Sequence, residues 1–264
     1  MRGTESIGEA AIYAGCQCYF GYPITPQNEL TEYMARRMLD TGRVFLQSES
    51  ELAAINMVLG ASATGKRVMT SSSSPGISLK QEGISFIAAM ELPAVIVNVM
   101  RGGPGLGNIA PSQSDYFQAT RGGGHGDYRT IVLGPASVQE LNDLTFEAFD
   151  LADIYRTPVL ILADGMMGQM MEPVTFKNDM LDPDKLPEKE WAIRGAKGRP
   201  SRFIRSLILN VDEEEEHNWR LHRKYQLIQR REVRYDEFNM ENAEMAVVAY
   251  GTAARIAKAA VKRC

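Results

Sequence analysis

Apolar residues between Thr4 and Gly165 follow two alternating spacings, one typical of helices and one typical of buried strands. In segment 27–39, Leu30, Met34 and Met38 share one helical face. Segments 94–100 (AVIVNVM) and 158–164 (PVLILAD) are apolar almost throughout, as a strand covered on both faces requires. This alternation predicts an α/β fold with a mostly parallel sheet and helices on both faces.

The same patterns predict the remaining elements of this region. Further strands are expected over 18–22, 44–47, 67–72 and 130–133, and further helices over 7–14, 51–64, 78–90 and 138–155. Ser6 and Glu9 have the spacing of a capping box for the first helix, which can also begin nearer Thr4. Gly15 and Gly65 are expected to end the helices before them.

Four distinctive loops follow the first four predicted strands. They contain Tyr22-Pro23-Ile24-Thr25-Pro26, the segment 47–51, the segment 71–76 and the segment 100–108. The ligand site of an open parallel sheet lies beyond the carboxyl ends of its strands. The sequence therefore predicts that these loops converge on one edge and form the functional site.

The pattern changes after Met171. Residues 1–172 are predicted to form the first domain, and 173–241 an irregular extension that ends in a charged helix. Segment 212–237 has 14 charged residues in 26, with acids first and bases later, which suits the dipole of a solvated linking helix. In 242–264, MAVVAYG predicts a strand and TAARIAKAAVKRC a helix. One strand and one helix cannot bury a core, so we expect 242–264 to begin a second domain that the sequence cuts short.

Composition excludes several classes of protein. A net charge of −4 lacks the basic excess that nucleic-acid binding needs, and no apolar run approaches the ~20 residues of a membrane-spanning helix. Cys16, Cys18 and Cys264 form no C-x-x-C pair, so we expect no metal site. Cys16 and Cys18 are expected to be buried as small apolar residues, on a shared face if their strand is regular. A reducing cytoplasm suits these features.

Two phosphate-binding motifs fail on inspection. Gly102 to Gly107 lacks the G-x-G-x-x-G order, because Pro104 and Asn108 occupy required glycine positions, and no P-loop pattern occurs. Segment 71–76 leaves two interpretations open. It can begin a helix whose free N–H groups hold an anion, or its serines can simply cap that helix.

Two charged residues in the loops are candidates for chemistry. Glu51 precedes an apolar helix, and burial there would let its carboxyl hold or share a proton. The alternative is that Glu51, like Glu49, is a surface residue that complements the helix dipole, which is the more common role of a glutamate at this position. Arg101 ends an apolar strand among glycines with no acid nearby in the sequence. It is either free for a ligand carboxylate or paired with a distant acid.

Taken together, these segments resemble the alpha subunit of the 2-oxoacid:ferredoxin oxidoreductases. The resemblance rests on GYPITPQNE, the Ser-Glu-Ser-Glu helix start, VMTSSSSPGISLKQEGI, VNVMRGGPGLGN and RGGGHGDY. It extends from Arg2 to about Glu172 and resumes weakly at VVAYGTAARIAKAAV. The sequence is most similar to the 2-oxoisovalerate (branched-chain) type, with the 2-oxoglutarate type as a near alternative.

The resemblance implies a pyrimidine-binding domain of a thiamine diphosphate enzyme. Glu51 would bind N1′ of the aminopyrimidine and share a proton with it; it is preferred to Glu49 because its interval to Gly60-Ala61 matches the family. Four further residues receive roles from the family. Tyr22, Pro23 and Ser74 are assigned to cofactor binding, and Thr25 to the catalytic substrate contact.

Arg101 would hold the carboxylate of the substrate, both as a binding and as a catalytic residue. His125 matches a pattern of the family, but the resemblance assigns it no role. It is either a proton donor or a residue whose hydrogen bond stabilises a turn, and the second role is more common for a histidine in a loop. The implied reaction is oxidative decarboxylation of a 2-oxo acid with coenzyme A to an acyl-CoA, with ferredoxin as the electron acceptor. Two alternatives are a non-catalytic assembly subunit and a non-oxidative thiamine-dependent decarboxylase.

The sequence also lacks two parts of such an enzyme. It contains no Gly-Asp-Gly segment, which in the family belongs to the Mg²⁺- and diphosphate-binding half, and no cysteine run for an iron–sulfur cluster. The resemblance therefore implies a beta subunit that holds both, a gamma subunit, and a homodimer of alpha-containing units.

Overall fold

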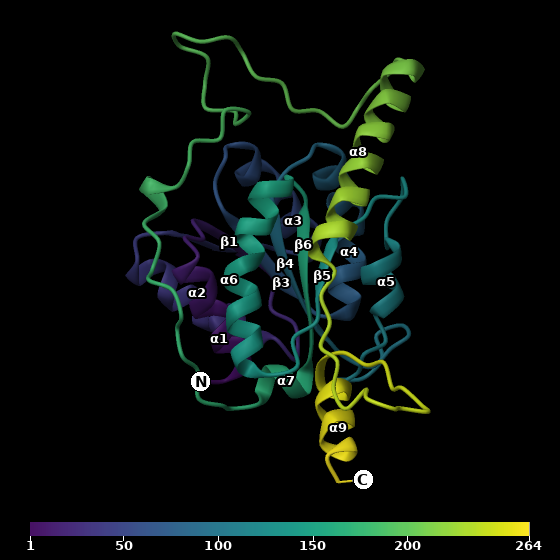
Figure 1. Cartoon of the computed structure of the whole chain (residues 1–264). Helices are drawn as coiled ribbons and strands as arrows, with labels where there is room; N and C mark the ends of the chain where they lie inside the picture. The colour runs from purple at the N-terminus through teal and green to yellow at the C-terminus, as the bar shows by residue number, and fades with distance from the viewer. Residues whose placement is uncertain (264) are drawn as a thin grey trace.

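A six-stranded sheet forms the centre of the protein in the computed structural model, which describes residues 1–263 (Figure 1). The strands lie in the order β2-β1-β3-β4-β6-β5, and every neighbouring pair is parallel. Their bounds are β1 Cys18–Gly21, β2 Val44–Gln47, β3 Val68–Ser72, β4 Ala94–Met100, β5 Ile131–Leu133 and β6 Pro158–Asp164. The predicted α/β class and parallel sheet are confirmed.

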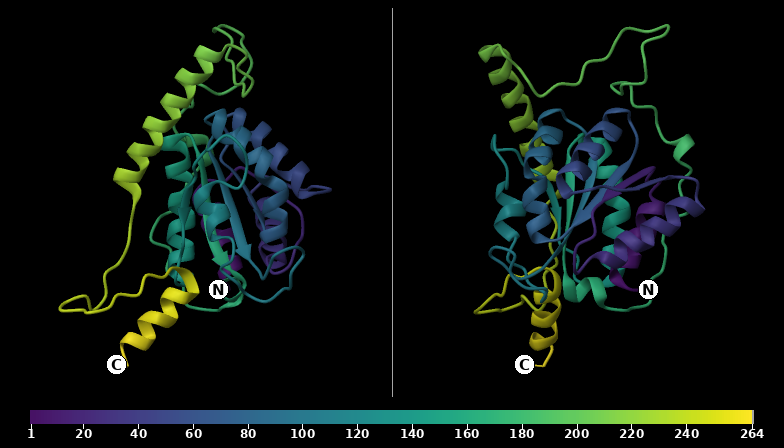
Figure 2. Two further views of the ribbon diagram at one scale, coloured as in Figure 1. Left: turned by 90° about the vertical axis from the view of Figure 1, so that its right-hand side faces the viewer. Right: turned by 180° about the vertical axis from the view of Figure 1, so that it is seen from behind.

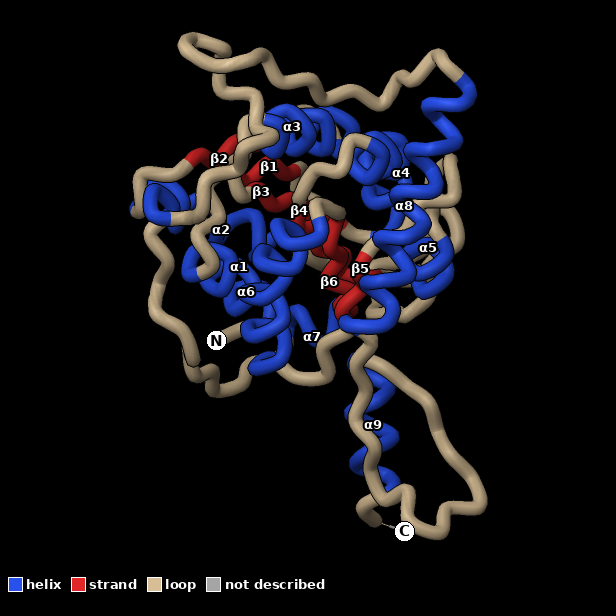
Figure 3. The backbone as a smooth tube through the Cα atoms, turned by 45° about the horizontal axis from the view of Figure 1, so that its top comes forward, coloured by secondary structure: helices blue, strands red, loops and turns tan. Residues whose placement is uncertain are grey.

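Helices cover both faces of this sheet, as Figure 3 shows. On one face lie α1, α2 and α6, and on the other lie α3, α4 and the short α5. The helices are α1 Gly3–Tyr13, α2 Asn28–Asp40, α3 Glu51–Ala63, α4 Ser74–Ala89, α5 Tyr116–Arg121, α6 Val138–Tyr155, α7 Gly165–Gln169, α8 Val211–Glu232 and α9 Gly251–Val261, with a 3₁₀ turn at Pro183–Lys185.

Two-sided burial explains the continuously apolar strands. In β4, Val95, Val97 and Val99 pack into the core beneath α1 and α6. Ile96 and Met100 point the other way, into the core beneath α3 and α4. Because neighbouring side chains of a strand point to opposite faces, apolar residues are favoured at nearly every position when both faces are covered; Asn98 is the one polar residue of β4.

Some predicted helix ends differ from the observed ones. The first helix begins at Gly3, so Ser6 and Glu9 lie inside it and the predicted capping box is wrong; the backbone N–H of Arg2 donates instead to the Glu5 carboxylate at 3.2 Å. Gly15 and Gly65 follow their helices with φ of 75° and 87°, as their predicted role as helix stops requires. The short helices α5 and α7 were not predicted, because glycines and a proline interrupt any helical period around them.

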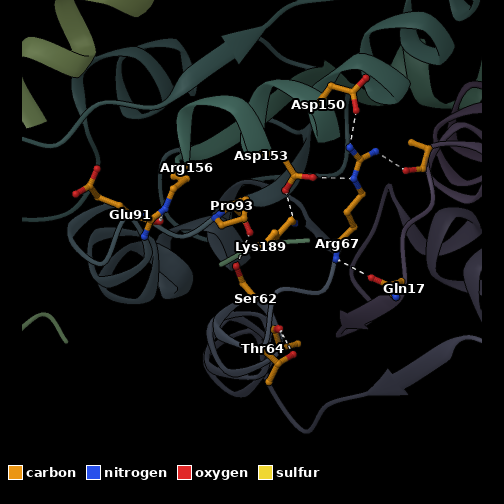
Figure 4. A network of polar contacts seen from close by, with 12 residues as sticks. Gln17, Ser62, Thr64, Arg67, Glu91, Pro93, Asp150, Asp153, Arg156 and Lys189 are labelled. Carbon is orange, nitrogen blue, oxygen red and sulfur yellow. Dashed lines mark hydrogen bonds and ion pairs between the residues drawn. The ribbon is translucent and has the colours of Figure 1, made fainter. Parts of the chain in front are cut away.

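The extension that begins after Glu172 is attached to the amino edge of the sheet. Arg67, which precedes β3, forms ion pairs with Asp150 at 2.5 Å and Asp153 at 2.9 Å on α6, and Lys189 of the extension pairs with Asp153 as well (Figure 4). The Ile193 N–H also donates to the Ala63 carbonyl at 2.9 Å. The extension is irregular, as predicted, but side-chain pairs fix its course.

The charged helix α8 passes beside β5 in Figure 1, and Figure 2 shows from two further sides that it lies on the outside of the molecule. Glu91, in the loop before β4, forms ion pairs with Arg220 at 2.9 Å and Lys224 at 3.0 Å of α8. Leu221 is buried, and Ile228 packs against the core. The predicted helix is confirmed, although it ends at Glu232, and one of its faces is docked rather than solvated.

The predicted strand in MAVVAYG is wrong. Segment 245–250 forms no strand, and Met245 and Val248 are 90% and 98% exposed. A strand needs a neighbouring backbone for its hydrogen bonds, and none of the described segments offers one here. The next element, α9, forms as predicted and contacts the first domain through the ion pair of Arg255 with Glu172 at 2.6 Å. The predicted domain boundaries and the interrupted second domain stay predictions.

Cys16 and Cys18 are both buried, as predicted, but they do not share a face. The strand begins only at Cys18, so Cys16 packs into the core under α1 and α6 while Cys18 packs under α3 and α4. Burial raises the pKa of the Cys16 thiol to about 12. Cys264 lies outside the described residues. Among the helices from Gly3 to Val261, none is long and apolar enough to cross a membrane.

Candidate functional site

The four distinctive loops meet at the carboxyl edge of the sheet. The strands β2, β1, β3 and β4 are consecutive neighbours and parallel, so the loop after each one starts at the same edge. In Figure 1 this edge faces down, toward α7, which directly follows β6. The predicted convergence of the loops is confirmed.

Glu51 occupies the first position of α3. Ser50 caps this helix by accepting a hydrogen bond from the Ala53 N–H at 3.1 Å. The helix start turns Glu51 inward, where it is only 6% exposed, whereas Glu49 is exposed to solvent. The burial expected for Glu51 is therefore confirmed, and of the two glutamates it is the one within the site.

A close approach at Gly76 places the Glu51 carboxyl against the start of α4. A Cβ atom on Gly76 would lie 2.7 Å from Glu51 Oε1 and 2.1 Å from Ser72 Oγ. Such distances are shorter than any van der Waals contact, so only glycine lets helix and carboxyl come this close. Gly76 thus sets the width of the site between α3 and α4.

The serines before Gly76 do not act as the helix cap that the sequence allowed. Ser73 is the N-cap residue of α4 with an extended backbone, but its side chain accepts no capping hydrogen bond. The hydroxyls of Ser72 and Ser73 are buried without a hydrogen-bond partner. Unpaired buried polar atoms cost free energy unless a ligand completes them, so these hydroxyls fit a site for a polar ligand.

Arg101 reaches from the end of β4 to the loop after β1. Its Nη1 donates to the Thr25 carbonyl at 2.9 Å and its Nη2 to the Leu106 carbonyl at 3.0 Å, while Nε is buried without a partner. Among the described residues no carboxylate forms an ion pair with it, so the alternative of a distant acid is wrong. The side chain is 6% exposed, and it retains unused hydrogen-bonding capacity.

Ser74 supports the Arg101 loop from behind. Its hydroxyl donates to Asp115 Oδ2 at 2.6 Å and accepts from the Arg101 N–H at 3.0 Å. Asn98 Nδ2 donates to the same Asp115 oxygen at 2.9 Å. The hydroxyl of Ser74 is thus engaged within the chain, and its role in cofactor binding stays a prediction.

Asn98 and Asp115 were not identified from the sequence. Asn98 had a usable signal, since it is the single polar residue in the apolar segment AVIVNVM. Asp115 had none, because it is one polar residue in a polar loop. Tyr250 lies close by; burial, together with the charges of Asp115 and Asp164, raises the pKa of its hydroxyl to about 12.

The other predicted site residues lie at or away from this edge. Pro23 and Thr25 are exposed at the rim and Tyr22 is half-buried, so all three can contact a ligand or a partner chain. His125 lies beside α4, where its carbonyl accepts from Ser85 Oγ at 2.8 Å and its ring packs edge-on against Phe86. Ser85 is 11 residues along α4 from Ser74, or about 16 Å. His125 is therefore not part of the site around Glu51.

The geometry agrees with the comparisons to known proteins. Residues 9–255 match the family described as pyruvate flavodoxin/ferredoxin oxidoreductase, thiamine diP-bdg. The ketoisovalerate oxidoreductase subunit VorB of Methanothermobacter marburgensis is 54% identical over 261 residues, which cover 99% of this chain and 74% of that protein. The chain belongs to the alpha-subunit family of the 2-oxoacid:ferredoxin oxidoreductases. The family inferred from the sequence is confirmed.

Other members of this oxidoreductase family are similar over a shorter part of their length. The 2-oxoglutarate synthase subunit KorA of Archaeoglobus fulgidus is 48% identical over 67% of this chain and 51% of its own. A solved structure, the 2-oxoglutarate:ferredoxin oxidoreductase from Magnetococcus marinus with 2-oxoglutarate, coenzyme A and succinyl-CoA bound, matches 100% of this chain with a TM-score of 0.79 and 26% identity. The chain spans half the length of that solved chain.

The residues at the carboxyl edge of the sheet fit one end of a thiamine diphosphate molecule, the cofactor that the family of this chain leads us to expect. The buried Glu51 carboxyl suits a ring nitrogen that carries or accepts a proton, and the hydroxyls of Ser72 and Ser73 are unpaired. Gly76 brings the Glu51 carboxyl and the Ser72 hydroxyl together at the start of α4. These residues would hold the part of the cofactor that carries such a ring nitrogen.

Proposed function

We propose that the chain is the alpha subunit of a thiamine diphosphate-dependent oxidoreductase that converts 2-oxoisovalerate, or a similar branched-chain 2-oxo acid, and coenzyme A to acyl-CoA and CO₂. The two electrons released pass to ferredoxin. The observation that carries the proposal is the buried Glu51 carboxyl, which lies against Gly76 at the start of α4. The branched-chain acid is favoured over 2-oxoglutarate because VorB is 54% identical over nearly the whole chain.

In this proposal, each residue of the site has a role that its position in the structure allows. Glu51 holds a proton at Oε1 or Oε2 between itself and the aminopyrimidine nitrogen. When bound, thiamine diphosphate supplies the electron sink that decarboxylation of a 2-oxo acid needs. Pro23 and Tyr22 form the wall of the pocket next to the cofactor, and Ser74 binds it or supports the loop that does.

Arg101 and Thr25 are proposed to bind the substrate. The guanidinium of Arg101 already lies against the backbone of Thr25, so one carboxylate can contact the Arg101 Nε–H and the Thr25 hydroxyl together. This contact would orient the 2-oxo group toward the cofactor. His125 receives no part in this mechanism.

The remaining parts of the enzyme are proposed to come from other subunits. A beta subunit would supply the Mg²⁺ and diphosphate site and the iron–sulfur clusters, and a gamma subunit would join them in a complex with two copies of this chain. VorB and KorA are both named as subunits, which supports such an assembly. We place this complex in the cytoplasm, where free thiols such as Cys16 and Cys18 persist.

Steady-state kinetics of the reconstituted complex test the proposal. Reduction of a viologen dye is measured with 2-oxoisovalerate, pyruvate and 2-oxoglutarate, each with and without coenzyme A. We expect the largest kcat/KM for 2-oxoisovalerate and no dye reduction without coenzyme A. A larger value for 2-oxoglutarate would favour the alternative substrate, and an aldehyde product without dye reduction would favour a non-oxidative decarboxylase. No turnover of any 2-oxo acid would favour an assembly subunit.

A further inference from the structure

Lys80 is a fully buried lysine to which the proposed function assigns no role. It lies in the middle of α4 with 0% of its surface exposed. Its Nζ donates a hydrogen bond to Thr70 Oγ1 on β3 at 2.7 Å. An ammonium group is strongly hydrated and has three N–H donors, so its burial is unfavourable unless a negative charge lies nearby.

The fold places Lys80 behind Glu51. Lys80 follows Gly76 by four residues, which puts both on one face of α4. Gly76 is the residue that contacts the Glu51 carboxyl. Thr70 and Ser72 also share a face of β3, the face on which Val68 packs beneath α3 and α4. Glu51, Ser72, Thr70 and Lys80 therefore form a buried polar column between α3, α4 and β3.

Charge links the two ends of this polar column. Burial lowers the pKa of Lys80 to about 7, and the negative charge of Glu51 acts in the opposite direction by favouring the ammonium form. Thr70, which accepts the hydrogen bond of Lys80, does not titrate in the physiological range. Among the described residues, Glu51 on α3 is the titratable group whose charge acts on Lys80.

We propose that Lys80 is a positioning residue for Glu51: its amino group, held by Thr70, orients the Glu51 carboxyl. The carboxyl lies against Gly76 at the start of α4, where its oxygens can contact a ligand nitrogen. This consequence for the ligand rests on the proposed function, whereas the coupling between Lys80 and Glu51 does not.

The coupling is measured by NMR on the full chain with ¹³C-labelled lysine. The Lys80 signal is the one that Lys80→Met removes, and Lys80→Arg gives the same assignment if the methionine variant does not fold. We expect Lys80 to titrate near neutral pH and Glu51→Gln to lower its midpoint by about one pH unit or more. The matched control is Glu49→Gln, which removes an exposed charge two residues away and should leave the midpoint unchanged. Equal midpoints in the two glutamine variants would overturn the proposal.

The consequence for catalysis is measured in the reconstituted complex. If Lys80 acts through Glu51, Lys80→Met lowers kcat about tenfold or more and leaves the KM of the 2-oxo acid within about twofold. Unchanged kcat would refute the positioning role. A complex that is inactive even with the unaltered chain would contradict the proposed function, and the NMR coupling would still stand.

Discussion

Two buried arginines at opposite edges of the sheet have the same exposure, 6%, and different surroundings. At the amino edge, each guanidinium nitrogen of Arg67 donates to one partner, which is Asp150, Asp153 or the Ala14 carbonyl (Figure 4). At the carboxyl edge, Arg101 contacts two backbone carbonyls, and its Nε has no partner. The first arginine thus has two carboxylate partners within the chain, whereas the second, among the described residues, has none and keeps a buried nitrogen without a partner.

The same difference extends to the glutamates of the two edges. Glu91, in the loop before β4, is paired with Arg220 and Lys224. Glu51, at the carboxyl edge, forms no direct ion pair within the described residues. A group whose partners are all internal contributes to stability, whereas a buried group with unused capacity is held in place for a ligand. The charged groups of the amino edge are therefore paired within the chain, whereas the carboxyl edge keeps buried polar groups with unused hydrogen-bonding capacity.

The largest effect that tests this comparison is expected at Glu51. In the reconstituted complex, Glu51→Gln should lower dye reduction driven by the 2-oxo acid ~10²-fold or more, because an amide cannot share the proton. The control Glu49→Gln removes the charge of the exposed neighbouring glutamate instead, and it should retain activity within about twofold. If Glu51→Gln keeps a third of the activity or more, the carboxyl edge has no proton-sharing role there.

The two arginines should respond in opposite ways to the same substitution. Arg67→Met leaves Asp150 without its partner and Asp153 with Lys189 alone, and it should lower the free energy of unfolding by about 3 kcal/mol, with KM unchanged. Arg101→Met removes only contacts to carbonyls and should cost about 1 kcal/mol of stability, but raise the KM of the 2-oxo acid about tenfold or more. Urea unfolding and steady-state kinetics on both variants measure this. If the two variants lose similar amounts of stability and have equal KM values, the two edges do not differ in function as proposed.

The smallest effect concerns pH and the docking of α8. Burial alone would raise the pKa of Glu91, but the ion pairs with Lys224 and Arg220 outweigh it and lower the pKa below its ordinary value. The pair therefore contributes stability above pH ~4.3, the pKa of Glu91 in the unfolded chain, and this contribution is lost as the pH falls through the lower folded value.

Glu91→Gln should accordingly cost about 2 kcal/mol at pH ~7, and the cost should shrink as the pH falls through the lowered folded pKa of Glu91. Hydrogen exchange in α8 should rise in the same variant, while exchange in α3 and β4 stays the same. A difference in unfolding free energy that does not depend on pH would mean that packing of Leu221 and Ile228, rather than the ion pairs, holds α8.

Particular residues show how far sequence reasoning reached. The apolar runs of β4 and β6 predicted their burial on both faces, because consecutive apolar side chains point to opposite faces of a strand and each face then needs a cover. Glu51 and Arg101 could be selected because each stands next to an apolar segment without a local counter-charge. Lys80 and Asp115 could not, since one sits in an ordinary helical stretch and the other in a polar loop. Their roles depend on which strand lies beside which.

The sequence by itself determined the parallel α/β architecture, the edge at which the loops meet and the family of the chain. The architecture and the edge follow from local periodicity and strand order, and the family follows from the resemblance that several motifs carry together. Only the tertiary structure decided that Glu51 rather than Glu49 is buried, that Arg101 has no acid partner, and that MAVVAYG forms no strand. Burial, charge pairing and strand formation are each completed by atoms far away in the sequence, so no local pattern can fix them.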